Sequence, residues 1–270
     1  MSNISYLEHC LKNEKIMRWS DNSMPLKVYV APFVWYKEKG NEYSYYSMVK
    51  DAFELWKEAS KGKVSYQFVN NLYASQINIE WKRVERSSLG HCYFNFDNMG
   101  RLYSAEVDIG LSDGLLHKQY EDKKEVKHTI IHEIGHALGL NHSPYREDIM
   151  YVPHQYGVVD ASKRDKRTLA WMYKFPPGLT QKEILAKYNF SSGKTIDDLI
   201  FHLENPEQNL NERKVETPEP FVAQEKKLVE EQDFLADVNK YNLSLQNISV
   251  SSNVQDYFKK IKIDREQGKK

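Results

Sequence analysis

The hydrophobic positions along this chain follow two different periods. In four short runs apolar and polar residues alternate, which predicts β-strands with one buried face. These runs lie at residues 25–32, 64–68, 77–81 and 102–109. Between the first two, residues 45–60 place apolar side chains at the spacing of an amphipathic helix about three turns long. The first half of the chain therefore predicts helices packed on a sheet.

Helical spacing returns in the second half of the chain. It begins at about residue 123 and recurs in three later stretches. Each of those three starts with Ser or Thr and carries an acidic residue three positions on, the pattern of a capping box. The pairs are Ser162 with Asp165, Thr180 with Glu183, and Thr195 with Asp198. By contrast, residues 85–100, ERSSLGHCYFNFDNMG, indicate a loop-rich segment.

Breaks in this pattern divide the chain into five parts. Pro176, Pro177 and Gly178 end the main domain, and the polar, proline-bearing stretch after residue 204 is typical of a linker. We predict an N-terminal segment at 1–22, the main domain at 23–178, a short helical hairpin at 179–204, a linker at 205–221 and a charged, mainly helical tail at 222–270.

Composition narrows the classes of partner. Lys plus Arg and Asp plus Glu balance at 38 each, so no global basic field favours nucleic acid. No run of about 18 apolar residues occurs, which predicts no membrane span. The polar start MSNISYLEHC shows no signal peptide, so we expect a cytoplasmic protein or one exported by a non-standard route. Cys10 and Cys92 are too few for a disulfide framework and leave free thiols or a single bridge.

The strongest chemical signal is a group of histidines. Four of the nine fall within residues 128–143, HTIIHEIGHALGLNHS. His132 and His136 stand one turn apart on the same side of a predicted helix, the separation at which two imidazoles bind a single zinc ion. Glu133 lies beside them, where a carboxylate can take a proton from zinc-bound water and return it to a leaving amine.

Gly139 suits the end of this helix, because glycine enters the left-handed region without a Cβ penalty. The turn that follows brings His142 to the metal as a third ligand and leaves the fourth position open, as in catalytic zinc sites. A hydrogen-bonded cluster of buried histidines is the alternative, and the five matched positions argue against it. His128 would fill the open position if it also bound, so we interpret it as a cleft-wall or partly solvated residue.

With these positions filled, the chain resembles the metzincin zinc metalloproteases, most closely the matrixin branch. Ser143 directly follows the third histidine, and Met150 in EDIMY matches the family's Met-turn, whose thioether lies under the three imidazoles. The similarity covers residues 24–174. It implies an α+β metzincin fold, in which a twisted, mostly parallel sheet packs on helices that include the zinc-binding helix. The sheet would have one antiparallel edge strand. AEVDIGL, residues 105–111, occupies the place of the strand that in the family lies antiparallel to bound peptide along the cleft.

The implied function is that of a zinc-dependent endopeptidase with one catalytic Zn²⁺. Its substrates would be proteins or peptides whose backbone pairs with the edge strand. By the same resemblance, Tyr151, Pro153 and Tyr156 form the wall of the specificity pocket. The spacing after Met150 nevertheless has one residue more than the family's Met-Tyr-Pro-x-Tyr.

Two features of many family members are missing from the sequence. Nothing around Cys10 resembles the cysteine-switch motif that keeps many matrixins latent. Cys10 lies upstream of the domain and could reach the zinc, but an ordinary thiol is the plainer interpretation. His91 stands where one ligand of a structural zinc is expected, but its companion ligands are not visible. The sequence therefore gives little support for a structural zinc or calcium ion, and it resembles a minimal, microbial type.

Two other interpretations stay open. The chain could be a non-catalytic binding protein on a metzincin fold, although the intact Glu133 argues against this. Residues 222–270 could direct a protease to a protein partner. A stabilising helical appendage is the plainer interpretation of these residues, because their apolar stripe is short and heavily charged. The natural substrate, the cleavage preference and the oligomeric state do not follow from the sequence.

Overall fold

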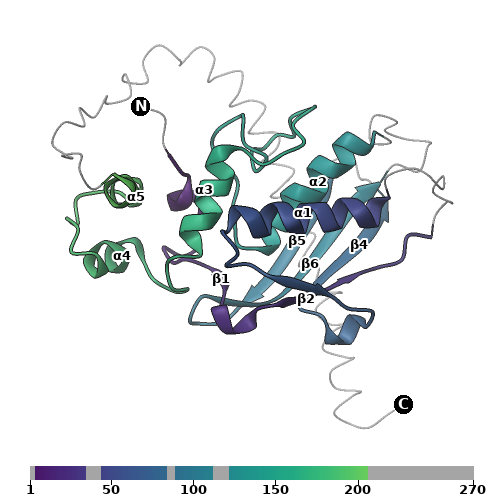
Figure 1. Cartoon of the computed structure of the whole chain (residues 1–270), viewed down its shortest axis with the longest axis horizontal. Helices are drawn as coiled ribbons and strands as arrows, with labels where there is room; N and C mark the ends of the chain where they lie inside the picture. The colour runs from purple at the N-terminus through teal and green to yellow at the C-terminus, as the bar shows by residue number, and fades with distance from the viewer. Residues whose placement is uncertain (1–3, 35–43, 84–88, 112–121, 206–270) are drawn as a thin grey trace, which may run out of the picture. The chain divides into compact units, whose positions relative to one another are not determined.

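The computed structural model describes residues 4–34, 44–83, 89–111 and 122–205 (Figure 1). All of them belong to one compact unit, which spans residues 1–212. The predicted tail at 222–270, and all of the predicted linker except residue 205, lie outside the described residues. No helix within the described ranges is both long and apolar enough to cross a membrane.

The described strands form one mixed sheet of six strands. They are β1 (Arg18–Trp19), β2 (Leu26–Val30), β3 (Tyr66–Phe68), β4 (Ile77–Arg83), β5 (Gly90–Phe96) and β6 (Arg101–Leu111). The order is β1-β6-β4-β2-β3, and β5 pairs with β6. Every pairing is parallel except that of β5 with β6, which is antiparallel. The predicted mostly parallel sheet is confirmed.

The antiparallel edge is β5, and two predictions are wrong here. Residues 85–100 are predicted to be loop-rich, yet 90–96 form a strand. AEVDIGL is predicted to lie antiparallel to bound peptide, yet β6 pairs with β4 on one side and with β5 on the other, so it offers no open edge to a peptide. In β5 the exposed His91, Tyr93 and Asn95 alternate with the half-buried Cys92, Phe94 and Phe96, so the pattern of a strand is present. The Ser, Gly, Asn and Asp residues on either side of it are what indicate a loop.

Five α-helices complete the described part of the chain. They are α1 (Tyr45–Ala59), α2 (Lys123–Ala137), α3 (Lys163–Met172), α4 (Gln181–Lys187) and α5 (Ile196–Glu204). Three short 3-10 helices lie at Leu7–Cys10, Asp21–Ser23 and Leu72–Ala74. The three predicted capping boxes are present at the starts of α3, α4 and α5. α4 and α5 contact each other, and α5 also contacts the first 3-10 helix.

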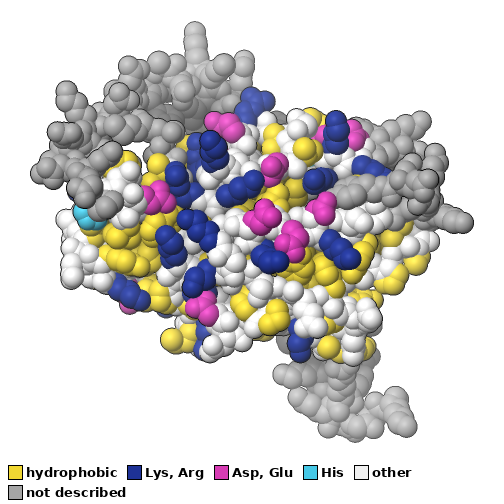
Figure 2. Space-filling model, in the orientation of Figure 1, with side chains coloured by type: hydrophobic (Ala, Val, Ile, Leu, Met, Phe, Trp, Pro, Cys, Tyr) yellow, Lys and Arg dark blue, Asp and Glu magenta, His cyan; other side chains and the backbone are white. Residues whose placement is uncertain are grey.

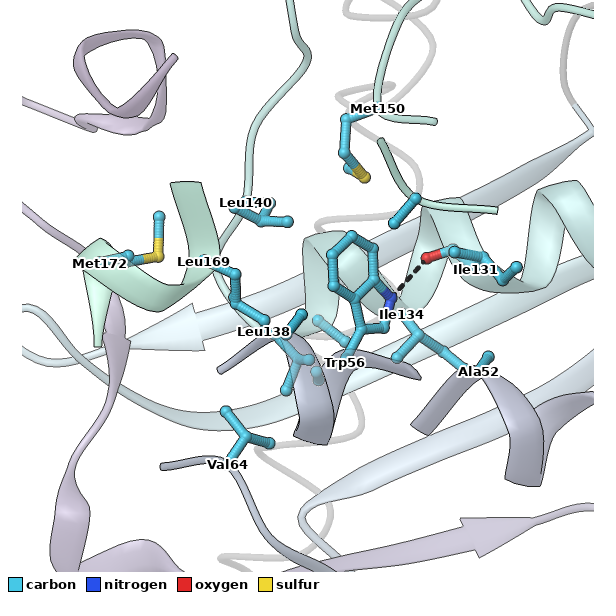
Figure 3. Close-up of a cluster of buried hydrophobic side chains, with 14 of the residues drawn as sticks. Ala52, Trp56, Val64, Ile131, Ile134, Leu138, Leu140, Met150, Leu169 and Met172 are labelled. Carbon is cyan, nitrogen blue, oxygen red and sulfur yellow. Dashed lines mark hydrogen bonds between the residues drawn. The ribbon is translucent and has the colours of Figure 1, made fainter. Parts of the chain in front are cut away.

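The core between α1 and α2 is organised around Trp56 (Figure 3). This tryptophan is fully buried, and its indole Nε1 donates a hydrogen bond of 3.0 Å to the Ile131 carbonyl of α2. Ala52, Ile134 and Leu138 lie around the ring. Loss of such a side chain typically costs about 3–5 kcal/mol. The contact therefore fixes α2, which carries the histidines, against α1.

The N-terminal residues are part of this core. Tyr6 and Trp19 are fully buried, and β1 pairs in parallel with β6. The Tyr6 hydroxyl donates to the Asp165 carboxylate at 2.8 Å, and the Trp19 indole donates to the Ala137 carbonyl at 2.8 Å. The boundary predicted at residue 23 thus separates side chains that share one core.

The outer faces of α1 and α3 carry charges of both signs. On the face drawn in Figure 2, Lys and Arg side chains lie among Asp and Glu, with hydrophobic surface between them. Lys166 pairs with Asp160 at 3.2 Å, and Arg167 lies 3.6 Å from Glu204. Exposed pairs of this kind contribute little to stability, typically about 0.2–1 kcal/mol each.

Candidate metal and catalytic site

Three histidine side chains meet at the end of α2. His132 and His136 lie on successive turns of the helix, and His142 follows it after a turn. Their potential ligand atoms all lie within 4.8 Å of one another, the one such group found among the described residues. The Nε2 atoms of His132 and His136 are 3.1 Å apart. The structure thus brings together the three residues predicted to bind a metal.

Hydrogen bonds to the backbone orient two of these rings. His132 Nδ1 donates to the Ile149 carbonyl and His136 Nδ1 donates to the Leu140 carbonyl, both at 2.8 Å. With the proton on Nδ1, each Nε2 presents its lone pair to the common centre. Burial, and next the neighbouring His142, lower the pKa of His136 to about 4, so its imidazole is in the neutral form that binds metal.

This donor set fits a zinc ion. Two nitrogens bound tetrahedrally at ~2.0–2.1 Å lie roughly 3.3 Å apart, close to the observed separation of the two Nε2 atoms. The group holds three imidazoles and no carboxylate or thiolate. Three protein ligands leave a tetrahedral ion one open position.

Gly139 makes the turn between the second and third histidines. Its φ is +103°, in the left-handed region, and a Cβ there would collide with the backbone carbonyl of Met17. Beyond the turn, the Asn141 side chain donates to the His9 carbonyl at 3.0 Å. The N-terminal segment therefore holds the chain immediately before His142.

Met150 lies beneath the backbone of α2. It is fully buried, and its backbone carbonyl accepts a hydrogen bond of 2.9 Å from the Ser143 amide. A Cβ built on Gly135 would lie 2.5 Å from the Met150 sulfur. Gly135, between the first two histidines, thus allows the thioether its close approach. Sequence reasoning missed this residue, although it lies within the HEIGH motif.

Glu133 is a buried carboxyl beside the histidine group, with 6% of its surface exposed. Burial, and next the charge of Asp108, raise its pKa to about 8. A Cβ on Gly90 of β5 would lie 2.7 Å from Glu133 Cγ. The start of the edge strand therefore passes directly over this side chain. Sequence reasoning missed Gly90 because its role depends on packing between β5 and α2, which are far apart in the sequence.

His128 has no place in the three-histidine group, and it is buried rather than partly solvated. Its Nδ1 donates to the Val158 carbonyl at 2.7 Å. Burial, and next the nearby His154, lower its pKa to about 4. The ring is stacked over that of His132, with centroids 6.1 Å apart.

The predicted wall residues lie on the segment after Met150. Tyr151 is half-buried, whereas Pro153 and Tyr156 are exposed. A separate cavity of about 300 Å³ borders His136. It is lined by residues of β5, of the N-terminal segment and of the turn after α2. Cys10 lines it as a buried thiol, because burial raises its pKa to about 12.

Comparisons with known proteins agree with this geometry. A family model described as Matrixin matches residues 19–174. A protein of Heliothis virescens ascovirus 3e, named "Putative matrix metalloproteinase", is 29% identical over 131 residues, 41% of this chain and 26% of its own length. One of the same name from Trichoplusia ni ascovirus 2c is 22% identical over 49% of this chain and 33% of its own length.

A third relative comes from another virus. "Probable matrix metalloproteinase 095L" of Invertebrate iridescent virus 3 is 26% identical over 177 residues. The match covers 61% of this chain and 45% of the viral protein. The chain therefore spans less than half the length of each of these relatives.

Proposed function

The chain belongs to the matrixin family, and from this premise we propose that it is a zinc-dependent endopeptidase. One observation carries the proposal: three convergent histidines lie next to a buried glutamate at the edge of a sheet. The names of the three viral relatives, which describe matrix metalloproteinases, support it.

We assign the zinc ligands to His132, His136 and His142. The Nδ1 hydrogen bonds of the first two hold their rings in place and keep Nε2 free for the metal. When bound, zinc polarises the scissile carbonyl and lowers the pKa of water towards neutrality. The thioether of Met150, which packs against α2 at Gly135, would form an apolar support under these rings, as in the family's Met-turn.

Glu133 is the proposed general base and acid. Its carboxylate takes a proton from the attacking water and then donates it to the amine of the leaving peptide. Its pKa of about 8 before any metal charge is added reflects an apolar site from which bulk water is excluded. A nearby cation lowers that pKa, which favours the ionised base at neutral pH.

Strand β5 is the proposed binding edge for substrate. One side of β5 pairs with β6, and no described strand pairs with its other side. A substrate added there as a further antiparallel strand would run past Glu133, because Gly90 lies against that side chain. Tyr151, Pro153 and Tyr156 would then face the substrate as one wall of a specificity pocket.

Cleavage of a quenched peptide library tests this proposal. Zinc-loaded wild type is compared with Glu133→Ala, and the zinc content of both is measured. We expect cleavage by the wild type and a loss of about a thousandfold or more in the variant at unchanged zinc content. A zinc-loaded wild type that cleaves no peptide would support the non-catalytic binding protein instead.

A further inference from the structure

A second buried polar cluster lies on α2 before the three histidines. Glu125 is buried and accepts hydrogen bonds from His154 Nε2, at 2.5 Å, and from the Gly157 amide, at 3.2 Å. One turn further along the helix, His128 donates to the Val158 carbonyl at 2.7 Å. Two side chains of α2 thus hold residues 154–158 at three points.

These bonds act on a segment that is only partly buried. Tyr156 and Gly157 are exposed, and Val158 is the one apolar residue of the segment that packs against the core. The carboxylate of Glu125 is buried, and a buried charge that loses its partner is strongly destabilising. The pair of Glu125 and His154 is therefore one of the contacts that fix the position of this segment, together with the bonds to Gly157 and Val158.

A row of rings links this cluster to the metal site. The ring of His154 meets that of His128 edge-on, with centroids 3.9 Å apart. His128 is in turn stacked over His132. On the outer side, Tyr156 lies edge-on to His154 at 5.2 Å and is 63% exposed. His154 therefore contacts both His128, on the side of the metal site, and the exposed Tyr156 ring, on the outer side.

The direction of β5 indicates which part of a substrate meets this segment. Gly90, at the start of β5, lies beside Thr129 and Glu133, whereas Phe94, further along, lies near His136. An antiparallel peptide places its residues C-terminal to the scissile bond beside the start of β5. That end of the cleft is the one nearer Glu125 and the segment it holds.

We propose that Glu125 and His154 are positioning residues for substrate selectivity. Their buried pair holds residues 154–158 in place as one wall of the cleft. This wall lets the cleft discriminate among substrate side chains C-terminal to the scissile bond. The inference rests on the proposed endopeptidase function. Neither residue is assigned a part in the chemistry of cleavage.

The test uses Glu125→Gln, which keeps the shape of the side chain and removes its charge. Glu58→Gln on α1 is the matched control, because Glu58 is exposed. Quenched peptides that differ only in the residue C-terminal to the scissile bond are assayed with the full-length, zinc-loaded protein. Selectivity is the ratio of kcat/KM for the preferred residue to that for glycine.

We expect Glu125→Gln to reduce this ratio about threefold to tenfold, through a higher KM for the preferred peptide. The kcat for the glycine peptide should change less than about twofold. Zinc content should equal that of the wild type, and Glu58→Gln should keep the wild-type ratio. His154→Gln, at a more exposed site, should lose selectivity in the same way and provides the test if Glu125→Gln does not fold.

Three results would count against the inference. An unchanged ratio in both variants would overturn it, and so would an equal fall in kcat/KM for every peptide, which indicates a merely structural role. In either case cleavage by the wild type would leave the proposed function standing. If the zinc-loaded wild type cleaves no peptide, the proposed function and this inference fall together.

Discussion

Gly90 lies directly against the side chain of Glu133. A Cβ at position 90 would stand 2.7 Å from Glu133 Cγ and 2.8 Å from its Oε1. The edge strand and the proposed catalytic base are therefore packed so closely that only glycine leaves the carboxyl in place. This relationship joins the proposed substrate-binding edge to the proposed chemistry.

Gly90→Ala should impair cleavage without removing the metal. The added methyl group displaces the Glu133 carboxyl, and a shift of about 1 Å in a catalytic group can cost about a hundredfold in rate. We expect kcat/KM to fall at least about tenfold at wild-type zinc content. Gly193→Ala, with no atom within 4 Å of the added Cβ, is the control. Wild-type activity in Gly90→Ala would show that Glu133 does not need this packing.

Much of the site follows from local sequence, because its residues lie within one helix and the turn after it. Helical spacing brings His132 and His136 together, and the glycine at position 139 marks the turn that brings His142 to them. The three capping boxes are equally predictable, since each depends on two residues three positions apart. Patterns of this kind need no knowledge of distant contacts.

Features that depend on tertiary packing could not be predicted in this way. The alternation along β5 is a local pattern, but the position of β5 at the edge of the sheet depends on its pairing with β6. The burial of Tyr6 depends on Asp165, which is far away in the sequence. The pair of Glu125 and His154 likewise joins residues that no local pattern connects.

Gly139→Ala should destabilise the fold and weaken zinc binding. Alanine at a φ of +103° is strained, and its methyl group would also collide with the Met17 carbonyl. Gly62→Ala separates the two effects, because Gly62 also has a positive φ but an added Cβ there meets nothing within 4 Å. We expect about 1–2 kcal/mol of strain in the control and at least about 1 kcal/mol more in Gly139→Ala. The free energy of unfolding is measured with urea, and an equal loss in Gly139→Ala and Gly62→Ala would contradict this expectation.

His128 should make the metal-free protein less stable in acid. Its pKa is about 4 in the folded protein against 6.5 for the free side chain, so between these values the unfolded state binds more protons. The contribution of neutral His128 to the free energy of unfolding is therefore complete above pH 6.5. It is lost as the pH falls towards 4, by up to about 3 kcal/mol.

The measurement is urea unfolding in the presence of a chelator at several pH values. In His128→Gln the loss of unfolding free energy between pH 6.5 and pH 4.5 should be smaller than in the wild type. An identical pH dependence in His128→Gln would argue that His128 is protonated or solvated in the folded protein.

Tyr6→Phe should destabilise the domain although the residue lies outside the predicted main domain. The variant leaves one oxygen of the buried Asp165 without the hydroxyl that donates to it. We expect a loss of about 1–3 kcal/mol in the free energy of unfolding. Tyr73→Phe is the control, because Tyr73 is 96% exposed and should change stability little. No difference between the two variants would mean that the N-terminal segment contributes nothing through this bond.

The central claim is that a single zinc ion, held by His132, His136 and His142, is required for peptide cleavage. Its most direct test is a zinc titration of the metal-free full-length protein, followed by the rate of cleavage of a quenched peptide. We predict a linear rise in activity that ends at about one equivalent of zinc, and no rise in His142→Ala at the same additions. Cleavage by the metal-free protein, or full activity in His142→Ala, would contradict the account.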